Sequence, residues 1–126
     1  MLVPEFCRRP GKVFGGHTGN TACDHYHRHD RDFALMAELG VRNYRFSINW
    51  SRLLPEGTGR INEDGLAFYD RLIDGMLLSG VEPWMTLFHW EYPAALQARG
   101  AWQNPDSPKW FADYAALAAR RYGDRV

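Results

Sequence analysis

A histidine followed by a tryptophan closes the most apolar stretch of the chain, and this pair is the first candidate for chemistry. The apolar stretch covers residues 84–88, and His89 and Trp90 follow it directly. A near-continuous apolar run is typical of a parallel strand that helices cover on its outer face. Ligands of α/β sheets bind at the carboxyl ends of such strands. We therefore expect His89 and Trp90 to lie at a ligand site.

Two other histidines, His25 and His29, have a spacing that zinc sites use, because they fall four residues apart in an expected helix. Arginines lie close to both in the sequence, which argues against a bound cation. Cys7 and Cys23 are the only cysteines and form no Cys-x-x-Cys motif, so neither a disulfide framework nor a cysteine-based zinc site is expected. The sequence thus predicts no metal and no cofactor, with a reducing cytoplasmic setting as the default.

Composition limits the class of partner. The chain has 126 residues, of which 45% are apolar and 24% charged, as in an ordinary globular domain. Its 15 basic and 15 acidic residues cancel and are interspersed, whereas a nucleic-acid or anionic-membrane partner needs a concentrated basic face. No apolar run approaches the length of a signal-peptide core or a transmembrane helix. A neutral, small ligand is therefore expected, with no nucleic acid and no membrane.

The elements that must position the site follow from periodicity and turn residues. We expect an irregular loop over residues 1–22, rich in glycine, proline and basic residues, and an α-β-α-β-α order over residues 23–126. Asn62 and Ser107 are the expected N-caps of the later helices, and Gly80 and Gly123 the expected stops. The expected segments are a helix over 24–39, a strand over 41–50, a loop over 51–61, a helix over 62–79, a strand over 80–90, a helical turn over 93–99 and a helix over 107–122.

This alternation predicts parallel strands joined by right-handed crossovers. Two such strands cannot cover their own faces and edges. A glycine-valine junction occurs at Gly40 and again at Gly80, and this period matches one unit of a (β/α)8 barrel. The expected fold class is therefore α/β, a partial (β/α)8 TIM barrel with about two βα units, a flanking helix and an N-terminal loop, so that residues 1–126 form a fragment of one barrel domain.

Five motifs resemble glycoside hydrolase family 1, the family of β-glucosidases and 6-phospho-β-glycosidases. The resemblance covers nearly the whole chain. The motifs occur in the family's order and spacing at residues 24–28 (Asp-His-Tyr-His-Arg), 44–50 (Tyr-Arg-Phe-Ser-Ile-Asn-Trp), 54–57 (Leu-Pro-Glu-Gly), 68–69 (Phe-Tyr) and 87–93 (Leu-Phe-His-Trp-Glu-Tyr-Pro).

The resemblance implies roles for five residues. His89 matches the family's histidine that hydrogen-bonds a sugar hydroxyl, and Trp90 the neighbouring indole that shapes the same subsite. Arg45 matches an arginine that pairs with the nucleophilic glutamate, and a cation that close lowers a carboxylate pKa. Asn49 and Trp50 are treated as supporting residues only.

The two catalytic glutamates that the family uses are not found here. Retaining glycosidases need two carboxyl groups about 5–5.5 Å apart, one as acid/base and one as nucleophile. In the family these lie in Asn-Glu-Pro and Glu-Asn-Gly motifs, and neither motif occurs in this sequence. Glu91, although next to the His-Trp pair, is interpreted as a loop anchor. No catalytic residue is therefore assigned within the chain.

The resemblance implies that the parent protein hydrolyses O-glycosyl bonds in carbohydrate metabolism, as a retaining β-glucosidase acting on a small β-glycoside or oligosaccharide. Two alternatives concern this chain alone. By itself, the chain is expected to be either a truncated, non-catalytic fragment or a sugar-binding module that uses Arg45, His89 and Trp90 without chemistry.

Overall fold

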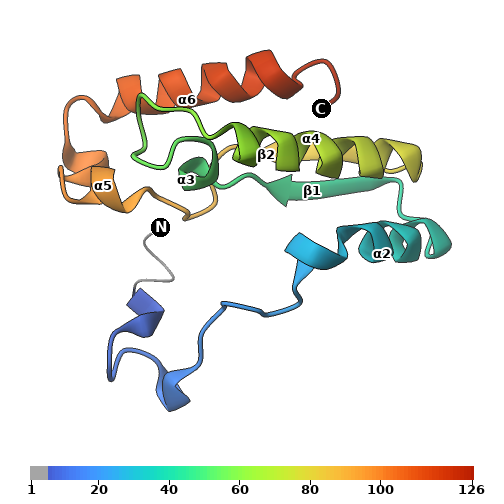
Figure 1. Cartoon of the computed structure of the whole chain (residues 1–126), viewed down its shortest axis with the longest axis horizontal. Helices are drawn as coiled ribbons and strands as arrows, with labels where there is room; N and C mark the ends of the chain where they lie inside the picture. The colour runs from blue at the N-terminus through green and yellow to red at the C-terminus, as the bar shows by residue number, and fades with distance from the viewer. Residues whose placement is uncertain (1–5) are drawn as a thin grey trace.

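Two parallel strands and three long helices form the body of the protein, as the computed structural model of residues 6–126 shows (Figure 1). The helix α4 lies along the strands, and α2 and α6 lie on either side of it, while residues 6–24 extend away from the sheet. In chain order the elements are η1 (Phe14–Gly16), α2 (His25–Glu38), β1 (Asn43–Ser47), α3 (Trp50–Leu53), α4 (Glu63–Leu78), β2 (Glu82–Thr86), α5 (Ala94–Gln97), η2 (Ala101–Gln103) and α6 (Ser107–Tyr122).

The sheet sets the orientation of everything that follows the strands. β1 and β2 pair in parallel, from Asn43 opposite Glu82 to Ser47 opposite Thr86. The carboxyl ends of both strands therefore lie side by side, and the segments that contain Asn49 and His89 leave the sheet there. The predicted alternation of helices with parallel strands is confirmed.

Helix α4 forms between a polar start and a glycine stop, as its sequence pattern predicts. Its buried residues recur at steps of three and four, which places one apolar stripe against the sheet: Leu66, Tyr69, Leu72, Ile73 and Met76. Asn62 occupies the N-cap position, but its side chain donates to the Arg52 carbonyl oxygen (2.9 Å) instead of capping the helix. The N-terminus of α4 is thus tied to the preceding α3.

Several predicted segments differ from the structure. The expected loop over residues 51–61 begins within α3. This helix is a single turn, too short for a helical period to be visible in the sequence. The strands are shorter than predicted, because the apolar runs continue beyond the residues that pair. Helix α6 starts at Ser107 with Asp106 as its N-cap, one residue before the expected cap. Of the predicted irregular segment 1–22, residues 1–5 lie outside the described residues, and η1 interrupts the remainder.

The core is centred on the indole of Trp50, which is fully buried. Its ring stacks on Tyr114 of α6, with centroids 4.8 Å apart and planes at 9°, and its Nε1 donates to the Gly57 carbonyl oxygen at 2.9 Å. Tyr92 meets the same ring edge-on. Trp50 thereby joins the end of β1, the loop before α4, the segment after β2 and α6. Among residues 6–126, none of the helices has both the length and the apolar character that crossing a bilayer requires.

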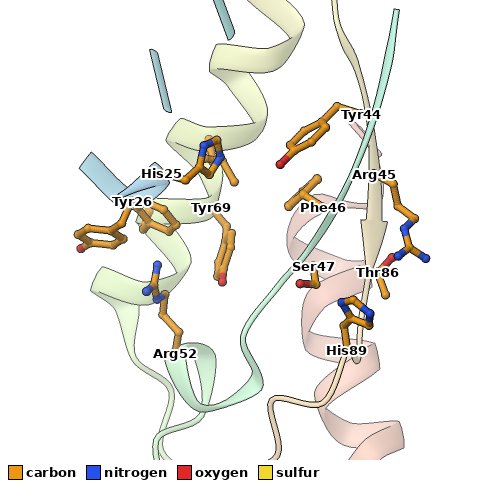
Figure 2. A pocket seen from close by; sticks show the side chains of 12 residues that line it. His25, Tyr26, Tyr44, Arg45, Phe46, Ser47, Arg52, Tyr69, Thr86 and His89 are labelled. Atoms are coloured by element: carbon orange, nitrogen blue, oxygen red, sulfur yellow. The ribbon is translucent and has the colours of Figure 1, made fainter. Parts of the chain in front are cut away.

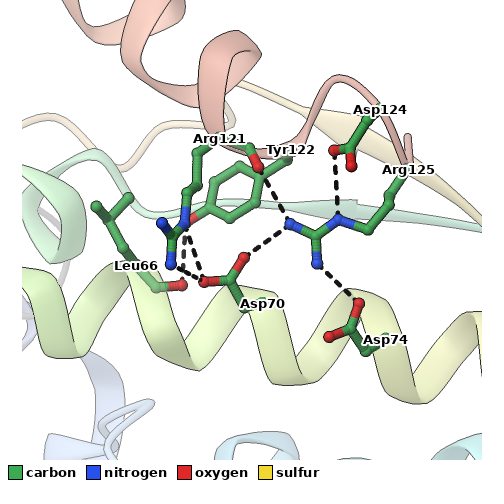
Figure 3. A network of polar contacts seen from close by, with 7 residues as sticks. All are labelled: Leu66, Asp70, Asp74, Arg121, Tyr122, Asp124 and Arg125. Atoms are coloured by element: carbon green, nitrogen blue, oxygen red, sulfur yellow. Dashed lines mark hydrogen bonds and ion pairs between the residues drawn. The ribbon is translucent and has the colours of Figure 1, made fainter.

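An ion-pair network fastens the end of α6 to α4 (Figure 3). Asp70 accepts from Arg121 (2.5 Å) and from Arg125 (2.8 Å), and Arg125 also pairs with Asp74 (2.7 Å). Partial burial opposes ionisation of the Asp70 carboxyl, but the hydrogen bonds from both arginines outweigh it and hold its pKa below the usual value. The network therefore favours the charged form of Asp70 in the folded chain.

Gly57 should tolerate a side chain less well than Gly59. Both have a left-handed backbone, φ +80° and +74°, which costs a residue with a Cβ roughly 1–2 kcal/mol. At Gly57 an added Cβ would also lie 2.5 Å from the side chain of Leu96, whereas at Gly59 it meets nothing within 4 Å. We expect Gly57→Ala to lower the free energy of unfolding by roughly 1–3 kcal/mol more than Gly59→Ala in urea titrations. Equal losses would contradict this packing.

Replacing Asp70 should destabilise the chain in a pH-dependent way. Asp70→Asn removes a carboxylate that accepts three hydrogen bonds from two arginines, and we expect a loss of about 1 kcal/mol at pH 7 after allowance for solvent screening. Because the folded pKa is depressed, this contribution is present above the unfolded-state pKa, about 3.9, and disappears as pH falls through the lower folded-state pKa. The measurement is urea unfolding by tryptophan fluorescence from pH 7 to pH 3.

The matched control is Asp113→Asn, since the ion pair that Asp113 forms among residues 6–126 is with exposed Lys109 in the same helix. We expect little change at any pH. A pH-independent difference between Asp70→Asn and the unaltered chain would contradict a role for the Asp70 charge.

Candidate functional site

A cavity of about 410 Å³ lies beside β1 and reaches the carboxyl ends of both strands (Figure 2). Four consecutive residues of β1 form one side, Tyr44 to Ser47, and residues of α2, α3 and α4 form the opposite side. The remaining residues at its boundary come from these helices and from the end of β2: His25, Tyr26, Arg52, Phe68, Tyr69, Leu72, Thr86 and His89.

His89 and Arg45, two of the predicted site residues, both contribute to this cavity. Arg45 is on β1 and points away from the helices, whereas its neighbours Tyr44 and Phe46 point toward them (Figure 2). His89 follows β2 by three residues and lies at the lower end of the cavity in this view. Both side chains belong to exposed residues. The parallel register therefore brings a guanidinium and an imidazole from separate strands to one region.

Trp90, predicted with His89 to contact the substrate, does not contribute to the cavity in the described chain. The residue is 73% exposed, and its backbone has φ +75°, a left-handed conformation that is rare for a residue other than glycine. Its carbonyl oxygen accepts from Tyr92 N–H at 3.0 Å, which closes a tight turn. The turn directs the indole into solvent.

The two supporting residues differ in position. Asn49 donates its backbone N–H to the Tyr69 hydroxyl at 2.8 Å, which ties the segment after β1 to α4. Burial raises the pKa of Tyr69, with a smaller opposing effect from that hydrogen bond, so the phenol is neutral over the physiological range. Trp50, in contrast, is fully buried in the core. Its contribution to the site is therefore through packing.

Arg52, Tyr26 and Tyr69 belong to the cavity although no pattern in the sequence identified them as its residues. The Arg52 guanidinium carbon lies 4.6 Å from the ring centroids of both Tyr26 and Phe68, and these two rings stack at 4.5 Å. Such cation-π contacts fix the arginine beside the cavity. Their partners come from three separate helices, and only the fold brings them together.

The histidines with zinc-like spacing are engaged with a carboxylate and with each other. His25 Nδ1 lies 2.5 Å from Asp32 Oδ2, and the His25 and His29 ring centroids are 6.4 Å apart. Within residues 6–126, no group of three or more histidine, cysteine or acidic side chains is arranged to hold a metal ion. Nothing in the described chain assigns these histidines to metal binding.

The cavity can donate hydrogen bonds but holds no carboxylate. Its charged or ionisable nitrogen groups are Arg45, Arg52, His25 and His89, and none of its twelve residues is acidic. Glu91, next to the site in sequence, has a buried Oε2 that accepts no hydrogen bond from the described residues. Such a set of donors suits a ligand rich in oxygen acceptors.

Comparisons with known proteins identify the group to which this chain is similar. The model of glycosyl hydrolase family 1 matches residues 2–126. Beta-glucosidase A of Thermotoga maritima is 50% identical over 121 residues, and thermostable beta-glucosidase B of Thermobispora bispora is 53% identical over 125 residues. These alignments cover 96% and 99% of this chain but 27% and 26% of the two relatives.

Solved structures give the same result. The family 1 β-glucosidase of Thermotoga maritima superposes with a TM-score of 0.95 at 48% identity, over 98% of this chain and 28% of that one. Another structure of the Thermotoga maritima enzyme, with the same score, is a complex with deoxynojirimycin. The chain therefore spans about a quarter of the length of the relatives it matches.

Proposed function

Because the chain belongs to glycosyl hydrolase family 1, we propose that it is part of an enzyme that hydrolyses O-glycosyl bonds by the retaining mechanism, with β-glucosides as the substrate class. The observation that carries the proposal is the convergence of Arg45 and His89, the family-matched residues, on one cavity. The beta-glucosidase names of the relatives support the substrate class.

His89 donates a hydrogen bond to a hydroxyl of the non-reducing sugar, and Trp90 supplies an apolar surface to the same ring. The exposure of both residues leaves them free to meet a ligand. Trp90 would approach that ligand from the turn after β2, once other parts of the enzyme enclose the site. Small β-glycosides are therefore the proposed partners.

Arg45 pairs with the nucleophilic carboxylate of the complete enzyme and keeps it ionised. Its side chain leaves the sheet on the face opposite the helices, and the described residues offer no carboxylate among those that form the cavity. A guanidinium within hydrogen-bonding distance of a carboxylate favours its charged, nucleophilic form.

We place the enzyme in the cytoplasm, consistent with Cys7 and Cys23, which are both free thiols.

On its own, this chain should not hydrolyse a β-glucoside. A retaining mechanism needs an acid/base and a nucleophile, and the cavity contains neither. We expect p-nitrophenyl β-D-glucoside to release no product above the uncatalysed rate with the purified chain. Turnover at an enzyme-like rate, about 1 s⁻¹ or more, would contradict the expectation that the chain alone is inactive. Saturable glucose binding by calorimetry without turnover would instead favour a sugar-binding module.

A chimera tests the role of His89. This chain replaces the matching segment of Thermotoga maritima beta-glucosidase A, and the chimera should hydrolyse the same substrate. We expect His89→Ala to lower kcat/KM by roughly 10- to 100-fold, since a substrate hydroxyl loses its partner in a desolvated site. His17→Ala is the control, because His17 is exposed and does not border the cavity. Equal activity of both variants would exclude His89 as a substrate contact.

In the same chimera, Arg45→Met should move the acid limb of the pH–rate profile to higher pH. Removing the cation raises the pKa of the nucleophile, so a smaller fraction is ionised at low pH. The measurement is kcat/KM from pH 4 to pH 8. A uniform loss of rate with an unmoved acid limb would show that Arg45 does not act on the ionisation of the nucleophile.

A further inference from the structure

The segment that carries His89 lies beyond the last paired residue of β2. Pairing with β1 ends at Thr86, whose carbonyl oxygen accepts from Ile48 N–H at 3.1 Å. Trp90, the residue after His89, has the left-handed φ of +75°. A strained backbone of this kind persists only where the surrounding structure fixes it. The contacts on either side of His89 therefore decide where its imidazole lies.

Tyr114 of α6 makes the contact on the side of β2. Its hydroxyl donates to the Leu87 carbonyl oxygen at 2.7 Å, two residues before His89. Tyr114 is 0% exposed, so residues 6–126 by themselves close this contact off from solvent. Burial raises the pKa of Tyr114, and the phenol therefore keeps its proton and remains a donor over the physiological range.

The hydroxyl of Tyr114 is the part of the side chain that packing does not require. The ring stacks on Trp50 with planes at 9°, and a phenylalanine ring would make the same stack. An oxygen placed in the core costs free energy unless it is hydrogen-bonded. The Leu87 carbonyl provides that bond, and the bond fixes a main-chain atom just after β2. Tyrosine thus links the core to the His89 segment, which phenylalanine could not do.

Tyr92 holds the segment on the other side of His89. The residue is 3% exposed, its ring meets Trp50 edge-on with centroids 5.4 Å apart, and its N–H donates to the Trp90 carbonyl oxygen. Tyr114 and Tyr92 therefore both pack on the Trp50 indole. His89 lies between the two positions that they fix.

We propose that Tyr114 is a positioning residue for His89, because its hydroxyl fixes the Leu87 carbonyl and so the point at which the chain turns from β2 toward the substrate. This inference rests on the proposed contact of His89 with a sugar hydroxyl. Hydrogen bonds weaken steeply outside a narrow range of distance and angle. A side chain that makes one to a substrate must be held to within roughly 0.5 Å. Tyr114 acts on the substrate only through this placement.

Tyr122 offers a matched comparison on the same helix. It is also 0% exposed, and its hydroxyl donates to a main-chain carbonyl oxygen at 3.1 Å, but that oxygen belongs to Leu66 of α4. Tyr114→Phe and Tyr122→Phe each remove one hydroxyl oxygen and keep the ring. We expect similar losses of global stability in urea titrations. Only Tyr114→Phe should loosen the segment that carries His89.

Hydrogen exchange of the full chain, with mass spectrometry of peptides that cover residues 87–91, tests the link. We expect Tyr114→Phe to speed exchange of these amides by about fivefold, which corresponds to about 1 kcal/mol. Tyr122→Phe should leave their exchange within about twofold of that in the unaltered chain. Equal exchange of residues 87–91 in the two variants would overturn the proposal.

The chimera with Thermotoga maritima beta-glucosidase A gives a second measurement, which also serves if Tyr114→Phe unfolds the isolated chain. We expect Tyr114→Phe to lower kcat/KM by about three- to tenfold and Tyr122→Phe by less than about twofold. With His89→Ala already in place, Tyr114→Phe should cause no further loss, because the contact that it positions is gone. An equal loss with and without His89 would overturn the proposal.

The proposed function and the positioning role fail on different results. An inactive chimera, or a His89→Ala chimera with full activity, would contradict the proposed function. The exchange comparison then decides by itself whether Tyr114 holds the His89 segment.

Discussion

The buried indole of Trp50 is the contact on which the rest of the arrangement depends. It stacks on Tyr114, and Tyr114 in turn donates its hydroxyl to the Leu87 carbonyl oxygen at 2.7 Å. The end of β1 is thereby connected, through one residue of α6, to the segment that leads from β2 to His89. A second tie runs from Trp50 Nε1 to the loop at Gly57. The position of the cavity relative to both strand ends follows from these contacts.

The parts of the fold that sequence predicts well are those with a period and a stop. Helix α4 has both, in its apolar stripe and in Gly80, and the parallel sheet followed from the alternation of elements. Helix α3 has neither, since four residues cannot display a helical period, and it forms because Trp50 and Leu53 are drawn into the core. Its existence is a consequence of tertiary packing.

In the site, too, some residues could be predicted from the sequence and others depend on tertiary packing. Arg45 and His89 could be predicted as candidates from the sequence, because each follows or interrupts an apolar strand and matches a family motif, and both border the cavity. Tyr26, Arg52 and Phe68 could not, since their contact joins helices distant in sequence. The placement of Trp90 in solvent also depends on a backbone angle that residue types do not reveal. Its proposed role in sugar binding stays a prediction.

The left-handed backbone of Trp90 means that the turn by itself would favour glycine over tryptophan at this position. Glycine adopts φ +75° without the cost that a Cβ imposes, and an indole that is 73% exposed gains little from burial. Selection for thermal resistance alone would therefore favour glycine at position 90. Under the role in sugar binding proposed for Trp90, engineering this segment for robustness would remove that contact with the ligand.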